Sequence, residues 1–191
     1  PAVMRPQHDS PYPDEEDHLR GMLQRLTTHD HRLLAALARR EAPGWLDRLL
    51  RASTHAGGAT APIVFSLILL AVPDTRRLGL VTGTANLLSH LAVQGLKRAV
   101  VRPRPSHTHP GVPALARIPD HFSFPSGHSA AAMALAVGVL LTEPIAGLPL
   151  LLLALLVGSS RVYLRVHYAT DVVVGQLLGA GAAVLAHLSA A

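Results

Sequence analysis

Long apolar runs separated by short polar connectors dominate the chain from about residue 52 onward. Runs of this kind, alternating with tight turns, predict antiparallel helices that cross a membrane. They cover residues 60–72, 78–100, 126–141, 145–162 and 171–188. Several are shorter than the ~20 residues that a lipid-exposed span needs. The pattern predicts an all-α, integral membrane bundle of about five spans, with its core in residues 52–191.

The first 51 residues follow a different pattern. Residues 1–25 are polar, with several prolines and a run of acidic residues, so we expect a loose arm. In residues 26–51, leucines recur at helical spacing between arginines, around the single Trp45. This pattern predicts two amphipathic helices, broken at residues 42–44, that lie at the membrane interface. The alternative is a soluble-type cap packed on the rest of the chain.

Composition excludes some classes of function. The chain has no cysteine, so it has neither a disulfide framework nor a thiol nucleophile or thiolate metal site. Its net charge of +5 could suggest nucleic acid, but the basic residues are not interleaved with aromatic ones, and we expect no nucleic-acid partner. The first 25 residues lack the apolar stretch of a cleavable signal peptide.

Three short stretches carry the residue types that bind and attack a phosphate group: KRAVVRPRP (97–105), FPSGH (124–128) and SRVYLRVHYATD (160–171). The second predicted span ends near Lys97 and the third begins at Ser126. The fourth ends at Arg161 and the fifth begins at Asp171. Because neighbouring spans alternate in direction, all four positions fall at the same end of the bundle. The alternating direction of the spans therefore predicts that the three stretches form a single site.

Each stretch has a plausible chemical task. Lysine and arginine can hold phosphate oxygens, arginine through two hydrogen bonds at once, and the candidates are Lys97, Arg104 and Arg161. The sequence Ser126-Gly127 reads as a helix start whose N–H groups face an anion, with His128 placed to protonate a leaving oxygen. The other arginines near span ends, Arg98, Arg102, Arg117 and Arg165, we interpret as contacts with lipid headgroups.

His167 and Asp171 are four residues apart, which places them on one helix face. A carboxylate on one imidazole nitrogen leaves the other nitrogen free to attack. Zinc is the competing interpretation, but no third ligand has suitable spacing and the surroundings are cationic, so we expect no metal. His90 belongs to a polar stripe that leads towards Lys97, and helix–helix hydrogen bonding explains it as well as a supporting role in the site does.

Taken together, the three stretches resemble the complete signature of the type 2 phosphatidic acid phosphatase superfamily, which vanadium haloperoxidases share. The resemblance covers about residues 55–190. It implies a mechanism without metal or cofactor, in which His167 attacks phosphorus, Asp171 orients it and His128 protonates the leaving group. It also implies phosphate-binding roles for Lys97, Arg104, Ser126, Gly127 and Arg161. Many relatives have a small residue where this chain has Arg165, which suggests contact with a second anionic group.

The bundle location predicts a lipid phosphate as substrate: phosphatidic acid, phosphatidylglycerophosphate, a polyprenyl (di)phosphate or a polyprenyl-linked sugar phosphate. The alternatives are a vanadate-dependent haloperoxidase and a non-catalytic lipid-phosphate-binding protein. We expect a multi-pass protein of the cell (inner or plasma) membrane. The sequence leaves open whether it forms a homo-oligomer. Eight arginines in residues 1–58 favour a site that faces the cytoplasm.

Overall fold

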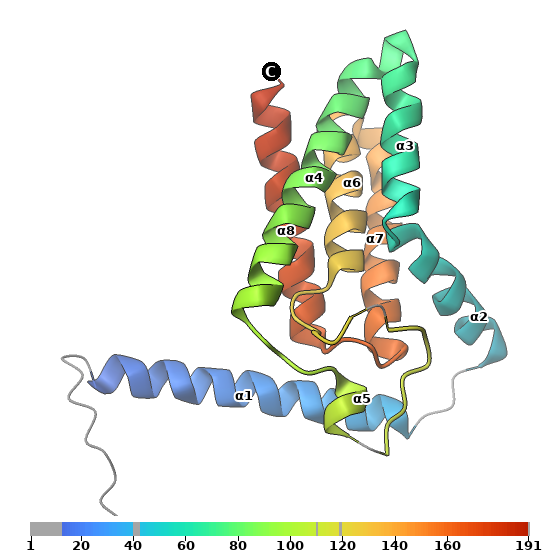
Figure 1. Ribbon diagram of the computed structural model, residues 1–191. Helices are drawn as coiled ribbons and strands as arrows, with labels where there is room; N and C mark the ends of the chain where they lie inside the picture. The colour runs from blue at the N-terminus through green and yellow to red at the C-terminus, as the bar shows by residue number, and fades with distance from the viewer. Residues whose placement is uncertain (1–12, 40–42, 110, 119, 191) are drawn as a thin grey trace, which may run out of the picture.

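The computed structural model describes residues 13–39, 43–109, 111–118 and 120–190, which form helices joined by short loops (Figure 1). Within these ranges the extended pairing is limited to an isolated bridge between Pro103 and Phe122. The all-α prediction is confirmed. The helices are α1 (Pro13–Ala38), α2 (Gly44–Ser53), α3 (Thr60–Ala71), α4 (Arg76–Ala99), α5 (Pro105–Thr108), α6 (Gly127–Thr142), α7 (Pro144–Tyr163) and α8 (Ala169–Ser189), with 3-10 turns η1 (Thr54–Gly57) and η2 (Pro73–Thr75).

Helices α3, α4, α6, α7 and α8 form the bundle, with α6 between α4, α7 and α8 (Figure 1). Two glycines of α8 let its backbone lie directly against α6. A Cβ atom at Gly175 would be 2.4 Å from the main-chain oxygen of Ser126, and one at Gly179 would be 2.2 Å from that of Ala130. A Cβ atom at Gly181 would meet open space. This close packing joins the start of α8 to the start of α6, where two of the three motifs lie.

Two of the described helices, α7 and α8, are long and apolar enough to cross a membrane. A third span results if the segment Gly44–Gly57 and α3, which meet at 54°, count as one broken span. Helix α6 is apolar but has only 16 residues, and α4 carries polar residues along its length. The protein is therefore a helical membrane protein, while the number of five spans stays a prediction.

The N-terminal segment differs in part from its prediction. Helix α1 begins at Pro13, so residues 13–25 are helical rather than a loose arm, and residues 1–12 lie outside the described ranges. It lies across the end of the bundle (Figure 1) and buries Leu34 there, whereas Leu33 is exposed. For α1 this is the arrangement of a cap. Trp45 on α2 is 63% exposed, and its place at the membrane interface stays a prediction.

Candidate active site

The three motif stretches meet around one cavity of about 530 Å³ at the end of the bundle that α1 covers. Helix α4 brings a residue from its last turn, α6 brings its first turn, and α7 brings its last turn. The loops before α5 and before α8 supply the rest. The motif residues that line the cavity are Lys97, Arg104, Gly127, His128, Arg161 and His167.

His167 is buried in the loop between α7 and α8, and both of its ring nitrogens have neighbours. Its Nδ1 lies 2.6 Å from the main-chain oxygen of Ser123. A carbonyl oxygen can only accept a hydrogen bond, so Nδ1 carries the proton and Nε2 keeps its lone pair. That Nε2 atom lies 3.3 Å from Nη1 of Arg104. Burial lowers the pKa of His167 to about 4, against the raising effect of Asp171, so the ring is neutral at pH 7.

Asp171 is fully buried in the first turn of α8. Its Oδ2 accepts a hydrogen bond from the main-chain N–H of Tyr168 at 2.9 Å and lies 3.6 Å from Nδ1 of His167. That second distance is too long for a hydrogen bond, but it places the negative charge of the carboxylate next to the ring. Its Oδ1 accepts a hydrogen bond from Arg102 Nη1 at 2.6 Å. Arg102 is therefore part of the site rather than a contact with lipid headgroups, which corrects its interpretation from the sequence.

Arg104 is 1% exposed and is held mainly by oxygen atoms of the loops. Its Nη1 donates to the main-chain oxygen of Val166 at 2.8 Å, and its Nε donates to that of Asp120 at 2.7 Å. Two carbonyls from different loops fix the plane of the guanidinium. The group thus faces the cavity in a defined orientation without needing another side chain.

The carboxylate of Asp120 joins two of the cations that were predicted to bind phosphate. Oδ2 lies 2.6 Å from Nζ of Lys97, and Oδ1 lies 2.7 Å from Nη2 of Arg104. Partial burial would raise the pKa of Asp120, but the hydrogen bonds from Lys97 and Arg104 outweigh it and hold this pKa below its ordinary value. An ionised carboxylate therefore occupies the N–H donors of Lys97 and Arg104 that were predicted to bind phosphate oxygens.

Arg161, on the last turn of α7, is buried beside the same cavity. Its Nη1 donates to Thr54 Oγ1 at 2.7 Å, and its Nε has no hydrogen-bond partner within the described part of the chain. A buried guanidinium with an unpaired N–H is costly. An anion in the cavity would satisfy it.

The first turn of α6 presents His128 and Gly127 to the cavity. Ser126 is completely buried and caps this helix, because its hydroxyl accepts from the N–H of Ser129 at 3.4 Å and pairs with the Ser129 hydroxyl at 2.8 Å. Ser126, which was predicted to bind phosphate, thus makes its hydrogen bonds within the first turn of α6. The positive end of the α6 dipole still points at the cavity.

The two remaining predicted residues lie in different places. His90 lines the cavity from α4, together with its stripe neighbours Asn86 and Gln94. Arg165 instead extends towards α1, where its Nη2 donates to the main-chain oxygen of Ala38 at 3.4 Å. The structure brings His90 into the site and holds Arg165 against α1.

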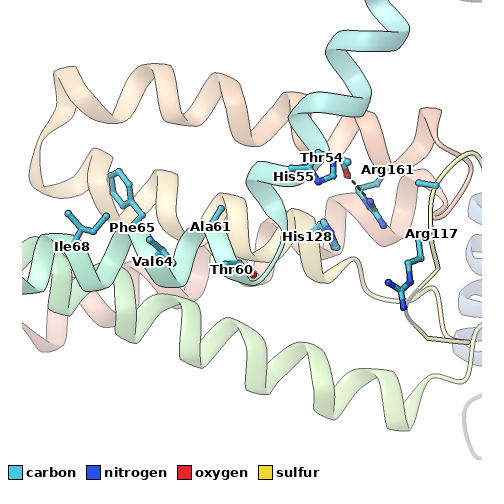
Figure 2. Close-up of a pocket in the computed structure, with 12 residues that line it drawn as sticks. Thr54, His55, Thr60, Ala61, Val64, Phe65, Ile68, Arg117, His128 and Arg161 are labelled. Atoms are coloured by element: carbon cyan, nitrogen blue, oxygen red, sulfur yellow. Dashed lines mark hydrogen bonds between the residues drawn. The ribbon is translucent and has the colours of Figure 1, made fainter.

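A second cavity, of about 720 Å³, lies on the other side of α3 and shares His128 and Arg161 with the first. Figure 2 shows these two residues, with Thr54 bonded to Arg161, at one end of it and Phe65 and Ile68 at the far end along α3. Figure 2 also shows Arg117 on the loop beside the same end. Both cavities therefore combine polar groups at the site with apolar walls farther along α3.

Sequence reasoning missed four contributors to the site: Thr54, Arg102, Asp120 and the Ser123 carbonyl. Asp120 had a signal, because it is the only acidic residue in the long excursion over residues 101–125. Thr54 and the Ser123 carbonyl had none, because their partners are set by tertiary contacts. No group of three or more His, Cys, Asp or Glu side chains in the described ranges could hold a metal ion.

Residues 74–191 match the family model of the PAP2 superfamily. The chain belongs to this superfamily. The PAP2 match contains all three motif stretches but excludes α1, α2 and α3. The family resemblance that the motifs suggested is thereby confirmed.

Similar proteins agree with the PAP2 assignment. Decaprenylphosphoryl-5-phosphoribose phosphatase of Mycobacterium tuberculosis is 39% identical over 112 residues, which are 58% of this chain and 60% of that protein. The transmembrane PAP2-type phosphatidylglycerolphosphate phosphatase of Bacillus subtilis superposes with a TM-score of 0.65 at 28% identity, over 84% of each chain. LpxE of Aquifex aeolicus gives 0.66 at 27% identity, over 81% of this chain and 92% of its own.

Proposed function

We propose that this PAP2 protein is a phosphatase that hydrolyses a membrane lipid phosphate through a phosphohistidine at His167. One observation carries the proposal. The Ser123 carbonyl accepts a hydrogen bond from Nδ1 of His167, which leaves the nucleophilic lone pair on Nε2, where Arg104 Nη1 lies 3.3 Å away and Arg161 lines the same cavity. A neutral nucleophile next to cations that bind the electrophile is the arrangement that phosphoryl transfer requires.

The reaction proceeds in two displacements. In the first, the Nε2 lone pair forms a bond to phosphorus while the bond from phosphorus to the lipid oxygen breaks, and His128 donates a proton to that oxygen. In the second, water attacks phosphorus and returns a proton to His128, and the N–P bond breaks to release inorganic phosphate and neutral His167. The negative substrate beside His128 favours the protonated imidazole that the first step needs.

The cations supply the electrostatic part of catalysis. Lys97, Arg104 and Arg161 reach the cavity from three separate elements, so they surround the phosphoryl group. Their charge takes the place that a metal ion has in other phosphatases, and the proposed reaction uses no cofactor. The Asp120 carboxylate must leave Lys97 and Arg104 when the substrate binds, because both sets of oxygens need the same donors.

A lipid substrate fits the walls of the two cavities. From the cations, the first cavity continues between α3 and α4 along Ile63, Leu67 and Leu87, which are also exposed on the bundle surface. A lipid tail can therefore reach the membrane directly. The second cavity offers room for a polar group on the other side of α3. This favours a polyprenyl-linked sugar phosphate, the class that the mycobacterial relative's name describes, among the four candidates.

For the orientation, we propose that the site faces the cytoplasm. Helix α1 and the motif loops share one end of the bundle and carry most of the arginines, while Arg76 and Arg77 begin α4 at the opposite end. Since the chain has no cysteine, Arg117→Cys gives a unique probe. In intact cells an impermeant maleimide should leave it unlabelled, and labelling without lysis would contradict this orientation.

The function is tested by phosphate release from the detergent-purified protein, with EDTA present, across the four lipid classes. We expect release from at least one lipid in the wild type, none in His167→Ala, and the fastest release from the polyprenyl-linked sugar phosphate. Lipid phosphate binding without release would favour the non-catalytic alternative. Activity that EDTA abolishes would contradict the metal-free mechanism.

A further inference from the structure

Helix α1 places a buried carboxylate next to the catalytic end of α8. Asp30 is 4% exposed and lies in the C-terminal half of α1, outside the region that matches the PAP2 family. The neighbouring α1 residues also face the site loop: His31 stacks on Tyr168 with ring centroids 5.5 Å apart, and Leu34 is buried. An acidic side chain on the buried face of a helix is costly unless its hydrogen bonds are all made.

Asp30 makes these hydrogen bonds at the first turn of α8. Its Oδ1 accepts from the main-chain N–H of Thr170 at 3.1 Å, and its Oδ2 accepts from the Thr170 hydroxyl. Asp30 thus caps α8 from another helix, in the way that an N-cap residue does within one chain segment. Since Asp171 is the next residue after Thr170, this cap fixes the backbone that carries the Asp171 carboxylate.

The same carboxylate holds Arg102, which also binds the Asp171 carboxylate and the Thr170 hydroxyl. Arg102 Nη2 lies 2.8 Å from Asp30 Oδ2, while its Nη1 donates to Asp171 Oδ1 at 2.6 Å and to the Thr170 hydroxyl at 2.7 Å. Its guanidinium also lies 4.0 Å from the centroid of the Tyr168 ring. One arginine is therefore shared between two buried carboxylates, and only one of them, Asp171, faces His167.

We propose that Asp30 is a positioning residue of the phosphatase, which acts on His167 through Arg102 and Asp171. This inference rests on the proposed function. Asp30 draws part of the positive charge of Arg102 to itself, so Asp171 keeps more of its negative charge for the imidazolium that forms when His167 attacks. Without Asp30, Arg102 would pair with Asp171 alone and the charge on His167 would be less stabilised.

The test compares Asp30→Asn with the wild type, each in the full chain, and repeats the comparison in an Asp171→Asn background. Asparagine keeps the size and one acceptor oxygen but removes the charge. We expect kcat to fall about tenfold with KM within about twofold, because Asp30 does not line the cavity. In the Asp171→Asn background the same change should alter kcat less than about twofold, because the residue through which Asp30 acts is gone.

A matched control separates positioning from docking of the helix. Leu34→Val loosens the apolar packing of α1 one turn away from Asp30, so we expect a lower melting temperature with kcat within about twofold. An equal loss of kcat in Leu34→Val and Asp30→Asn would assign the effect to helix docking and overturn the proposal. So would a loss in Asp30→Asn that is the same in both backgrounds, or no loss at all.

A readout that does not need activity separates this proposal from the proposed function. His167 Nδ1 lies 2.6 Å from the main-chain oxygen of Ser123, so we expect its proton to give a downfield NMR resonance that is absent from His167→Ala. We expect Asp30→Asn to shift this resonance and Leu34→Val to leave it in place. An active wild type with an unchanged resonance in Asp30→Asn would overturn only the assignment of Asp30. A shifted resonance in a protein that hydrolyses no lipid phosphate would support the link and overturn the phosphatase function.

Discussion

The main-chain oxygen of Ser123 lies 2.6 Å from Nδ1 of His167, a full ångström closer than the nearest oxygen of Asp171 at 3.6 Å. The backbone therefore selects the imidazole tautomer, and the carboxylate adds negative charge next to the ring. In a Ser-His-Asp triad the carboxylate does both tasks. Here the two tasks are divided between a loop carbonyl and a helix side chain.

This division predicts a moderate effect of Asp171→Asn. The tautomer survives because Ser123 still accepts from Nδ1, while the charge that stabilises the forming imidazolium is lost. We expect kcat to fall about 10²-fold, less than the roughly 10⁴-fold loss in a triad where the carboxylate also sets the tautomer. Steady-state phosphate release measures this, with Asp47→Asn, whose carboxylate pairs with Arg51 on α2, as a charge-matched control. A loss as complete as that in His167→Ala would contradict the division.

The low pKa of His167 predicts how the site responds to acid. Burial lowers this pKa to about 4, so the ring stays neutral and nucleophilic down to nearly that pH. Because the same histidine in the unfolded chain has a pKa near 6.5, protonation favours the unfolded state as the pH falls below about 6.5, and stability decreases towards acid. NMR titration of the His167 ring should give a midpoint near pH 4. A midpoint near 6.5 would contradict the burial of this ring.

The position of Asp120 predicts that its removal increases the affinity for inorganic phosphate. Its carboxylate competes with phosphate for Lys97 and Arg104, while Arg104 keeps two main-chain acceptors after the side chain is truncated. We therefore expect Asp120→Ala to lower the inhibition constant of inorganic phosphate by about tenfold, which corresponds to about 1.4 kcal/mol. Inhibition of lipid hydrolysis by added phosphate measures it. A higher inhibition constant would show that Asp120 positions the cations rather than competing for them.

The packing of α8 on α6 predicts opposite effects for two glycines of the same helix. A methyl group at Gly179 would meet the main-chain oxygen of Ala130 at 2.2 Å, so Gly179→Ala must push the helices apart. Gly181 faces open space, and alanine there adds up to about 1 kcal/mol through helix propensity. Thermal unfolding in detergent should show a lower melting temperature for Gly179→Ala and an equal or higher one for Gly181→Ala. Equal losses would contradict the α6–α8 contact.

Some features of this protein could be predicted from sequence because they follow from local pattern. The apolar runs predicted the helices, and the alternation of their directions predicted that Lys97, Arg161 and Asp171 lie at one end of the bundle. The number of spans could not be predicted from the apolar pattern, because α4 carries polar residues that line the cavity and α6 is short. Length and hydrophobicity alone do not separate such helices from true spans.

Other features could not be predicted because they depend on which surfaces dock. Arg102 resembles any arginine near a span end, and only the position of α1 gives it Asp30 as a partner. Leu33 and Leu34 both fit the apolar pattern of an amphipathic helix, yet only Leu34 of the two is buried. The carbonyl of Ser123 has no signal in the sequence, because every residue has a main-chain carbonyl. Only the conformation of the loop decides which carbonyl meets His167.

In the proposed mechanism His167 forms a covalent bond to phosphorus. Rapid acid-free quenching of the wild type with a ³²P-labelled lipid phosphate, followed by mapping of the labelled peptide, tests this bond. We expect a phosphoenzyme that is stable in alkali, lost in acid and located at His167, and that is absent from His167→Ala. A label on another residue, or turnover of the lipid by His167→Ala, would contradict it.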